Sequence, residues 1–388
     1  MDFSRTELEM ELEMRVHRFI AEIVIPRERT AGALGSGPTD ELRRELQALA
    51  RKAGLLAPQL SREFGGHGLS FRQTATVLRA AGYSLLGPLA LNVAAPDEGN
   101  MHLLEKIASP AQLERYLRPL AAGEIRSCFL MTEPDGGAGS DPRMLRTSAR
   151  RVGDEWIIEG RKWLITGALG AAFGIVMART DHGATMFLID MADPAVRLER
   201  MLETLDSSMV GGHAVVVLDG VHVSSDQVLG AVNEGFRYAQ VRLAPARLTH
   251  CMRWWGAAKR AHDVAARYAA RREAFGKALI EHEGVGFMLA DNLIDLQQCL
   301  LIIDHTAWVL DQGSPATSES SMAKIACSEA LFAVADRALQ ILGGAGITRD
   351  HPVEQIFREI RAFRIYDGPS EVHRWSLAGH LVRELRDG

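Results

Sequence analysis

Residues 173–189 read Phe-Gly-Ile-Val-Met-Ala-Arg-Thr-Asp-His-Gly-Ala-Thr-Met-Phe-Leu-Ile, and this stretch decides how the middle of the chain folds. It contains two short apolar runs, at 173–177 and 185–189, with Asp181-His182-Gly183 between them. Short β-branched or apolar runs bounded by turn residues are typical of strands. We therefore expect two neighbouring strands joined by a turn.

Similar segments lie on both sides of this pair. Residues 155–159 (Glu-Trp-Ile-Ile-Glu) and 214–218 (Ala-Val-Val-Val-Leu) have the same length and character. Several short strands in succession, without helices between them, predict a compact sheet or barrel. The β region begins near Cys128 and ends around Leu229-Gly230.

Outside the β region the sequence has helical features. On the N-terminal side, Ser70 with Gln73 and Ser109 with Gln112 form capping-box patterns that open helices. After Gly235 four long helices with short connections predict an antiparallel bundle. The four helices are expected at 235–275, with Pro245 at its start or at a kink, and at 285–310, 317–342 and 370–386.

The expected fold is therefore mainly α with a β middle domain. We predict an α-helical N-terminal domain at 1–126, a middle β-barrel domain at 127–232 and a C-terminal four-helix bundle at 233–388. Two or three domains are also what a chain of 388 residues requires.

Composition narrows the class of protein. With 47% hydrophobic and 24% charged residues the chain is that of a soluble globular protein, and a net charge of -5 argues against a nucleic-acid partner. No run approaches the roughly 18 apolar residues of a membrane span. The Glu-rich N-terminus is unlike a signal peptide. The four scattered cysteines form no metal or disulfide pattern, so we expect a cytoplasmic protein without a metal site.

A turn near the C-terminus is the expected place of the chemistry. Residues 366–374 read Tyr-Asp-Gly-Pro-Ser-Glu-Val-His-Arg. Gly368-Pro369 favours a turn, so the carboxylate of Asp367 can project into a pocket. Taken alone, however, an Asp before a Gly is more often just a turn residue.

Four further stretches carry weak signals of the same kind. A Gly-rich loop at 131–141 can present N–H groups to a phosphate, although it can also be a plain surface loop. At 162–167, Trp163 can stack on a flat ring or simply be buried. Arg272 and Phe275 can clamp a phosphate and cover an adenine, but basic residues at a helix end also complement its dipole. The stretch 340–346 can be only a helix stop.

Together these stretches resemble the acyl-CoA dehydrogenase family. The matching elements are Thr-Glu-Pro (132–134) with Gly-Ser-Asp (139–141), Lys-Trp-Leu-Ile-Thr-Gly (162–167), Arg-Arg-Glu-Ala-Phe-Gly-Lys (271–277), Gln-Ile-Leu-Gly-Gly-Ala-Gly (340–346) and the 366–374 turn. The resemblance covers essentially the whole chain. It implies the same α, β, α fold, FAD shared between subunits of a homotetramer or dimer, and an electron-transferring flavoprotein as acceptor.

The resemblance also implies roles for single residues. Asp367 falls at the catalytic base, and Arg247, Gly368 and Ser140 at substrate-binding positions. Thr166 resembles the hydroxyl donor to the reactive flavin nitrogen. The positions implied for cofactor binding are Met131, Thr132, Gly139, Ser140, Leu164, Ile165, Thr166, Arg272, Phe275, His282, Gln340, Gly343, Gly344, Pro369 and Glu371.

Departures from the family pattern are concentrated near the expected site. The base is Asp where the family usually has Glu, so its side chain is one methylene shorter. The Gly-rich loop is two residues longer than usual, Trp163 stands one place before the position where the indole is expected, and Glu283 and Pro369 replace a common Gln and Thr.

The implied reaction is the α,β-dehydrogenation of an acyl-CoA, with Asp367 removing the α proton and the β hydride passing to flavin. Burial beside an acyl chain is expected to raise the pKa of Asp367. Ala246 stands where some relatives carry a second acidic residue. Two alternatives remain: a flavin oxidase of the nitroalkane oxidase type, which also uses Asp, and a non-catalytic flavin-binding relative.

Overall fold

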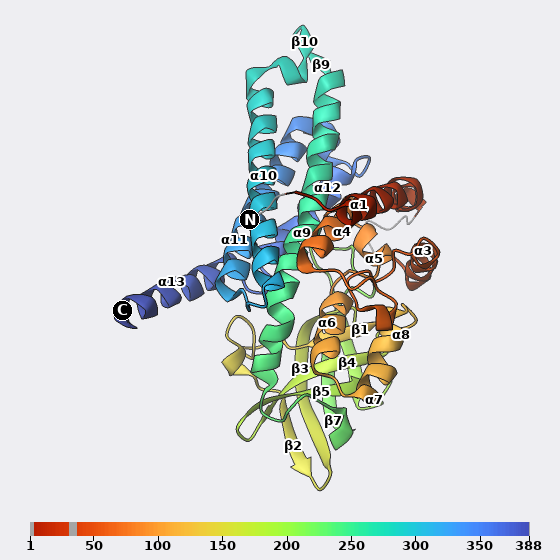
Figure 1. Cartoon of the computed structure of the whole chain (residues 1–388), viewed down its shortest axis with the longest axis vertical. Helices are drawn as coiled ribbons and strands as arrows, with labels where there is room; N and C mark the ends of the chain where they lie inside the picture. Colours follow the sequence, from red (N-terminus) through yellow and green to blue (C-terminus); the bar gives the residue numbers. More distant parts are fainter. Residues whose placement is uncertain (1–3, 31–36, 388) are drawn as a thin grey trace. The chain divides into compact units, whose positions relative to one another are not determined.

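A computed structural model describes residues 4–30 and 37–387 of the chain (Figure 1). Helices precede and follow a β region, so the predicted fold class is confirmed. Contacts divide the chain into two compact units. The helical unit comprises Met1–Leu34, Leu69–Pro88 and Ala246–Gly388, and the sheet unit comprises Gly35–Gly68 and Leu89–Pro245. This division cuts across the chain differently from the predicted three-domain boundaries, which stay a prediction.

The sheet unit contains an eight-stranded sheet in the order β6-β7-β3-β2-β4-β5-β8, with β1 paired in parallel to β4. The strands are β1 (Ser127–Leu130), β2 (Ser148–Val152), β3 (Glu155–Thr166), β4 (Phe173–Thr180), β5 (Gly183–Asp190), β6 (Val196–Leu202), β7 (His213–Ser224) and β8 (Val228–Leu229). The four predicted strand segments lie in β3, β4, β5 and β7. The other strands are short or rich in arginine, and their pattern gave no signal.

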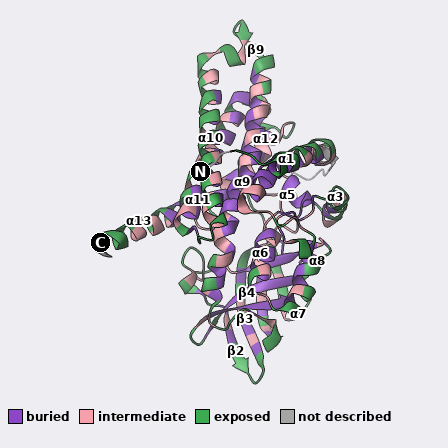
Figure 2. Ribbon diagram, in the orientation of Figure 1, coloured by how far each residue is buried: buried purple, intermediate pink, exposed green. Residues whose placement is uncertain are grey.

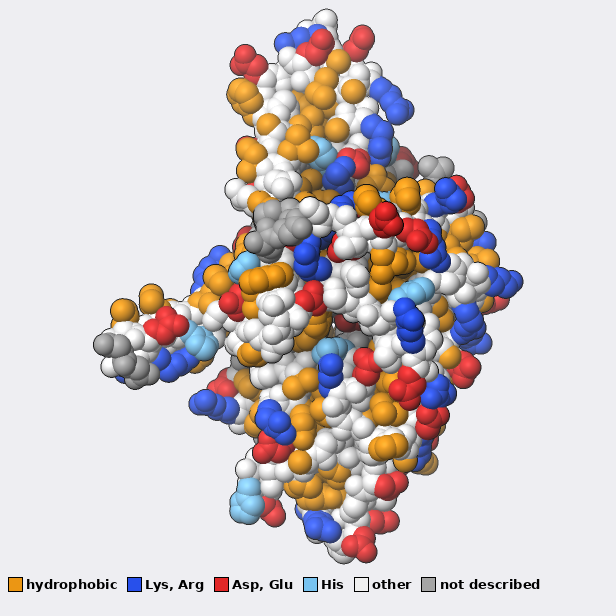
Figure 3. Space-filling view, viewed as in Figure 1, with side chains coloured by type: hydrophobic (Ala, Val, Ile, Leu, Met, Phe, Trp, Pro, Cys, Tyr) orange, Lys and Arg blue, Asp and Glu red, His pale blue; other side chains and the backbone are white. Residues whose placement is uncertain are grey.

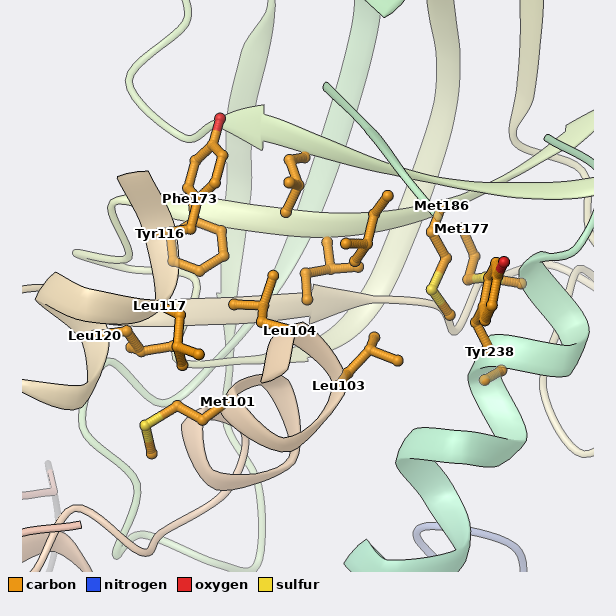
Figure 4. Packing of buried hydrophobic residues seen from close by; sticks show 14 of the residues in the cluster. Met101, Leu103, Leu104, Tyr116, Leu117, Leu120, Phe173, Met177, Met186 and Tyr238 are labelled. Carbon is orange, nitrogen blue, oxygen red and sulfur yellow. The ribbon is translucent and has the colours of Figure 1, made fainter. Parts of the chain in front are cut away.

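The apolar runs of β4 and β5 are continuous because both faces of these strands are buried. On one face Phe173 and Met177 join a cluster with residues of α6 (Asp97–Ile107), and the ring of Tyr116 lies 4.9 Å from that of Phe173 (Figure 4). On the other face Val176 and Phe187 join a cluster to which β1 to β7 all contribute. The sheet thus curves around a core of its own.

The N-terminal helices are short, and α1, α3, α4 and α7 begin at a side-chain cap. They are α1 (Glu7–Phe19), α2 (Ile25–Thr30), α3 (Asp40–Lys52), α4 (Phe71–Gly82), α5 (Gly87–Ala90), α6, α7 (Pro110–Gln112) and α8 (Arg118–Ala121). Both predicted capping boxes are confirmed: Ser70 pairs with Gln73 at the start of α4, and Ser109 with Gln112 at the start of α7.

The helical unit is built around the C-terminal helices, of which α9 belongs to it from Ala246 onward. They are α9 (Gly235–Arg271, with Pro245 inside it), α10 (Glu283–Asp311), α11 (Thr317–Leu342), α12 (Pro352–Phe363) and α13 (Ser370–Asp387). Helix α11 packs against α10, α12 and α13, and the buried residues of this unit include Leu331, Val334 and Phe363. Figure 2 colours the chain by burial. Helix α12 was not predicted, although its Val353, Ile356 and Ile360 repeat at helical spacing.

Helix α9 ends earlier than predicted. It stops at Arg271, and a two-stranded hairpin follows, with β9 (Glu273–Ala274) paired to β10 (Lys277–Ala278). Phe275 and Gly276 form the turn, with φ angles of 52° and 83°. Two successive left-handed residues are what a tight hairpin turn needs, and they are incompatible with a continuing helix.

Two helices are long and apolar enough to cross a membrane by length and composition alone, α10 and the segment from Thr317 to Ile347. This is weak evidence, because core helices of soluble proteins pass the same test. Figure 3 shows hydrophobic side chains gathered over the helices at its top. The expected absence of a membrane span therefore stays a prediction. Within residues 4–30 and 37–387 no group of three or more His, Cys, Asp or Glu side chains could hold a metal ion.

Candidate active site

Asp367 lies in the tight turn between α12 and α13 of the helical unit. Its φ is 53° and that of Gly368 is 96°, so two successive residues have left-handed backbone. A Cβ atom on Gly368 would lie 2.7 Å from Nε2 of His373. Glycine is therefore required at 368 for both its conformation and the close approach of this side chain.

The backbone of the turn is held by two donors. The carbonyl oxygen of Asp367 accepts hydrogen bonds from Nε of Arg247 and from Nε2 of His373, both at 3.1 Å. Nδ1 of His373 in turn lies 3.2 Å from Oγ of Ser321. Burial, followed by the charge of Arg247, lowers the pKa of His373 to about 4. His373 is therefore neutral near pH 7 and fixes the position from which the Asp367 side chain extends.

The carboxylate of Asp367 faces a histidine on α9. Oδ2 lies 3.2 Å from Nε2 of His250, and the Asp367 side chain is 21% exposed. The His250 ring is itself held between the rings of Phe363 and Tyr366, at 5.9 and 4.9 Å. Nδ1 of His250 lies 3.1 Å from the guanidinium of Arg253. The side chain that the sequence singled out is thus half-buried and positioned.

Positive charge surrounds this carboxylate. Lys324 of α11 is fully buried, its Nζ has no hydrogen-bond partner among the described residues, and it lies 5.4 Å from the ring centroid of Phe363. Burial lowers the pKa of Lys324 to about 8, and burial also lowers the pKa of Arg247. The position before Arg247 on α9 is a buried alanine, Ala246, so it supplies no second carboxylate. Such surroundings favour the ionised form of the carboxylate, which is the form that can accept a proton.

In the sheet unit, the 131–141 loop is anchored by a buried ion pair. Nζ of Lys162 lies 2.9 Å from Oε1 of Glu133, and both side chains are at most 2% exposed. Glu133 also accepts hydrogen bonds from the backbone N–H groups of Ala138, Arg146 and Thr147. Burial raises the pKa of Glu133, but the charge of Lys162 and these donors outweigh it and lower the pKa to about 2. The loop is therefore anchored at Glu133, and its role in binding a ligand stays a prediction.

Part of the predicted ligand-binding surface of this loop is accessible. Gly139 and Ser140 are exposed, and a Cβ atom on Gly139 would meet nothing within 4 Å. The carbonyl of Thr132 accepts a hydrogen bond from the N–H of Trp163 at 2.9 Å, and Met131 packs against the core. A phosphate or a ring could approach the backbone at Gly139.

A bulge in β3 presents Trp163 and Leu164. The pairing of β3 with β7 shifts between Lys162 and Ile165, and Leu164 has a φ of 55°. Bulges of this kind turn side chains out of the regular alternation. Trp163 is 36% exposed and Leu164 39%, whereas Ile165 is buried in the sheet core and leaves only its backbone for a ligand. Both apolar side chains can therefore meet a flat ring.

Thr166, at the end of β3, belongs to a hydrogen-bonded chain. Its Oγ1 lies 3.0 Å from Nδ1 of His213, and Nε2 of His213 lies 3.0 Å from Oδ2 of Asp206. Burial raises the pKa of Asp206, but hydrogen bonding and charge from His213 hold it below its usual value. The sequence analysis did not find His213 or Asp206.

Arg272, Phe275 and His282 come together at the β9–β10 hairpin of the helical unit. Nε2 of His282 lies 3.0 Å from the carbonyl oxygen of Ala274, and its ring is 6.2 Å from that of Phe275. Arg272 is exposed and Phe275 is 97% exposed. A fully exposed phenylalanine on a fixed hairpin is available to cover a ring of a ligand or a partner.

The remaining predicted positions lie at the ends of two helices of the same unit. Gln340, Gly343 and Gly344 close α11 and are exposed, and a Cβ atom on either glycine would meet nothing within 4 Å. Pro369 is half-buried, and Glu371, in the first turn of α13, is exposed. A dinucleotide such as FAD can accept hydrogen bonds from open glycine backbone, from hydroxyls and from an arginine, and exposed aromatic side chains can cover its rings.

The sequence analysis found Asp367 but missed most of the residues around it. His250 and Arg253 follow Arg247 at three-residue intervals on α9, so they share one face of the helix. That spacing was a signal the sequence analysis could have used. Lys324 gave no signal, because only the packing of α11 shows that it is buried.

Comparisons with known proteins match the chain along its length. Three family models match it: "Acyl-CoA dehydrogenase, N-terminal domain" at residues 6–124, "Acyl-CoA dehydrogenase, middle domain" at 128–220 and "Acyl-CoA dehydrogenase, C-terminal domain" at 233–382. The probable acyl-CoA dehydrogenase FadE2 of Mycobacterium tuberculosis is 35% identical over 99% of this chain and 98% of its own.

Two further matches are a longer relative and a solved structure. Acyl-CoA dehydrogenase family member 11 of Gallus gallus is 33% identical over 97% of this chain, but the chain spans only 51% of that protein. The structure of a glutaryl-CoA dehydrogenase from Mycobacterium smegmatis in complex with FADH2 has 25% identity and a TM-score of 0.88, covering 97% of this chain and 95% of that one.

Proposed function

The chain belongs to the acyl-CoA dehydrogenase family, and we propose that Asp367 is the base that removes the α proton of its acyl-CoA substrate. As a member of this family, the protein is an FAD-dependent oxidoreductase that dehydrogenates acyl-CoA thioesters. When bound, FAD accepts the hydride from the β carbon. The observation that carries the proposal is the half-buried carboxylate of Asp367, held on a fixed turn among cations.

An α-thioester proton is a weak acid, so the base needs help from its surroundings. Arg247 and Lys324 supply positive charge near the carboxylate, and this favours its ionised form, which is the form that can accept the proton. The two hydrogen bonds to the Asp367 carbonyl fix the backbone of this residue, and therefore the point from which its short side chain extends.

We further propose that each unit, taken by itself, offers residues for binding FAD. In the sheet unit Thr132, Gly139, Ser140, Thr166 and the Trp163-Leu164 bulge offer hydroxyls, open backbone and apolar surface. In the helical unit the exposed Arg272 and Phe275 and the open end of α11 suit contacts with a cofactor from a second copy. We therefore propose a homo-oligomer, a tetramer or a dimer.

This cofactor proposal predicts that Arg272→Ala releases FAD and loosens the assembly together, because a charged group that reaches a diphosphate contributes to both. The ratio of flavin to protein after gel filtration and the mass by light scattering measure the two effects. Arg271→Ala, which removes the neighbouring exposed arginine, is the matched control. A fully flavinated monomer of Arg272→Ala would contradict the shared site.

Partners and location follow as proposals of the same kind. An electron-transferring flavoprotein is the proposed acceptor, and no nucleic-acid partner is proposed for a chain with a net charge of -5. The four cysteines are free thiols and all are buried, which agrees with a reducing compartment such as the cytoplasm.

The test is anaerobic reduction of the FAD-loaded protein by a panel of acyl-CoAs, followed by flavin absorbance. We expect rapid bleaching by at least one saturated acyl-CoA and reoxidation by an electron-transferring flavoprotein. Bleaching by nitroalkanes with rapid reoxidation by oxygen would instead support an oxidase. A flavin that no acyl-CoA and no nitroalkane reduces would favour a non-catalytic relative.

A further inference from the structure

One face of α9 carries three nitrogen-containing side chains in a row, and two of them join Asp367 in a chain of contacts. Oδ2 of Asp367 lies 3.2 Å from Nε2 of His250, and Nδ1 of His250 lies 3.1 Å from the guanidinium of Arg253. His250 and Arg253 are each 6% exposed. The histidine therefore has a different partner on each ring nitrogen, and both contacts are shielded from water.

The partner on Nδ1 determines the protonation state of the ring. A guanidinium has only donors and stays protonated in proteins, so Nδ1 has to accept and cannot carry a hydrogen. The single ring hydrogen is then on Nε2, where it points at the Asp367 carboxylate. A second proton would place an N–H against the donors of Arg253. His250 is therefore neutral and acts as a donor.

We propose that His250, fixed by Arg253 as a neutral Nε2–H donor, is a positioning residue that holds Oδ2 of Asp367 and thereby orients the carboxylate of the base. This inference rests on the proposed role of Asp367 as the base. His250 cannot take the proton onward, because Nε2 already carries one and the Nδ1 lone pair is engaged by Arg253. Its effect is to orient the base and to favour its ionised form.

Other charged and titratable groups also face Asp367. They are Arg247 on α9, Lys324 on α11, His373 on α13 and Tyr366 in the turn itself. His373 has a pKa of about 4 and Lys324 one of about 8, so neither changes charge between pH 5 and 7. These groups are common to all variants of His250. A difference between His250 variants in that range therefore reports the His250 contact.

The first test measures the tautomer and does not depend on catalysis. The FAD-loaded protein is labelled with ¹⁵N-histidine, and the His250 signals are assigned by their loss in His250→Gln. We expect a neutral ring with its hydrogen on Nε2 between pH 5.5 and 8. A doubly protonated ring at pH 6.5, or a hydrogen on Nδ1, would overturn the proposal even if Asp367 is the base.

Arg253→Met is the second variant for this measurement. Without the guanidinium, Nδ1 can take a proton beside the Asp367 carboxylate, so His250 should titrate at or above roughly pH 6.5. A His250 that stays neutral at pH 6 in Arg253→Met would show that Arg253 does not fix its state. This outcome would also contradict the proposal.

The second test compares pH profiles of anaerobic flavin reduction. His250→Leu removes the donor, so the pKa of the carboxylate rises and the acid limb should move up by about 1 to 2 pH units. His250→Gln places an amide N–H near the position of Nε2 and should keep the limb within about 0.5 unit of wild type. His182→Gln, in the exposed β4–β5 turn, is the control for loss of a histidine.

The result that would overturn the proposal is an unmoved limb in His250→Leu, or an equal shift in His250→Gln and His250→Leu. Failure of the proposed function has a different signature. If Asp367→Asn reduced flavin at the wild-type rate, the base would lie elsewhere, whatever the His250 variants did.

Discussion

Glu133 and Asp367 are two carboxylates in tight loops, and their surroundings differ in a way that separates a structural group from the proposed base. Glu133 is buried against Lys162 and accepts three backbone hydrogen bonds as well. At Asp367 the two donors from Arg247 and His373 go to the backbone carbonyl, and the carboxylate itself is 21% exposed. Protonation of Glu133 would weaken the ion pair and the hydrogen bonds that anchor its loop. The carboxylate of Asp367 is positioned by its backbone and can take up a proton.

The variant Asp367→Asn is the strongest test of the proposed difference between Asp367 and Glu133. The amide is nearly isosteric, so the turn and the FAD content should persist. Flavin reduction by an active acyl-CoA should fall by more than the roughly 10²–10⁴-fold usual for removing a general base, because Ala246 leaves no substitute carboxylate. Stopped-flow absorbance under anaerobic conditions measures the rate. Asp350→Asn, at an exposed position, is the control.

The next effect concerns stability instead of rate. Glu133→Gln leaves Lys162 buried without a counter-charge, so the protein should lose about 3 to 5 kcal/mol of unfolding free energy. Urea denaturation measures the loss. Adding Lys162→Met to this variant removes the orphaned charge and should recover part of the stability. If Glu133→Gln unfolds at the wild-type urea concentration, Glu133 is not a structural carboxylate.

The pH dependence of the same pair provides a third test. The pKa of Glu133 is lowered to about 2 in the folded protein, below its value of 4.5 in an unfolded chain. Its stabilisation is therefore fully present above pH 4.5 and is lost as the pH falls toward 2. The difference in unfolding free energy between wild type and Glu133→Gln should include about 3 kcal/mol that shrinks over this range. A difference that is the same at pH 3 and pH 6 would contradict the assignment.

Asp367→Glu is the smallest of these effects and sharpens the comparison. The turn is fixed by the Asp367 carbonyl, so an added methylene should carry the carboxylate away from His250 and from the α carbon. We expect flavin reduction to fall by about 10- to 100-fold with FAD content unchanged. The same stopped-flow measurement checks it. An increase in rate would mean that the pocket is shaped for the longer side chain.

The sequence was sufficient for the fold class because its signals there are local. The strands of the hairpin at 173–189 and the capping boxes at Ser70 and Ser109 depend on neighbouring residues only. Helix α12 was missed because it is one of the short helices. Helix α9 was extended too far because phenylalanine rarely adopts the left-handed backbone conformation that Phe275 has here.

The site was less accessible to sequence analysis than the fold. Asp367 could be singled out because the 366–374 turn resembles a family motif, and the register shift of β3 at Trp163-Leu164 gave no signal in the sequence. The partners of Asp367 could not be found in this way. His250, Lys324 and His373 come from three different helices, and only tertiary packing brings them to one turn.

The most direct test of Asp367 as the base is proton exchange without hydride transfer. The FAD-loaded protein in D₂O is given an acyl-CoA of active chain length whose β carbon carries no hydrogen, and deuterium at the α carbon is followed by mass spectrometry. The wild type should exchange the α protons, and Asp367→Asn should exchange them no faster than a solution without enzyme. Exchange at the wild-type rate in Asp367→Asn would contradict the account.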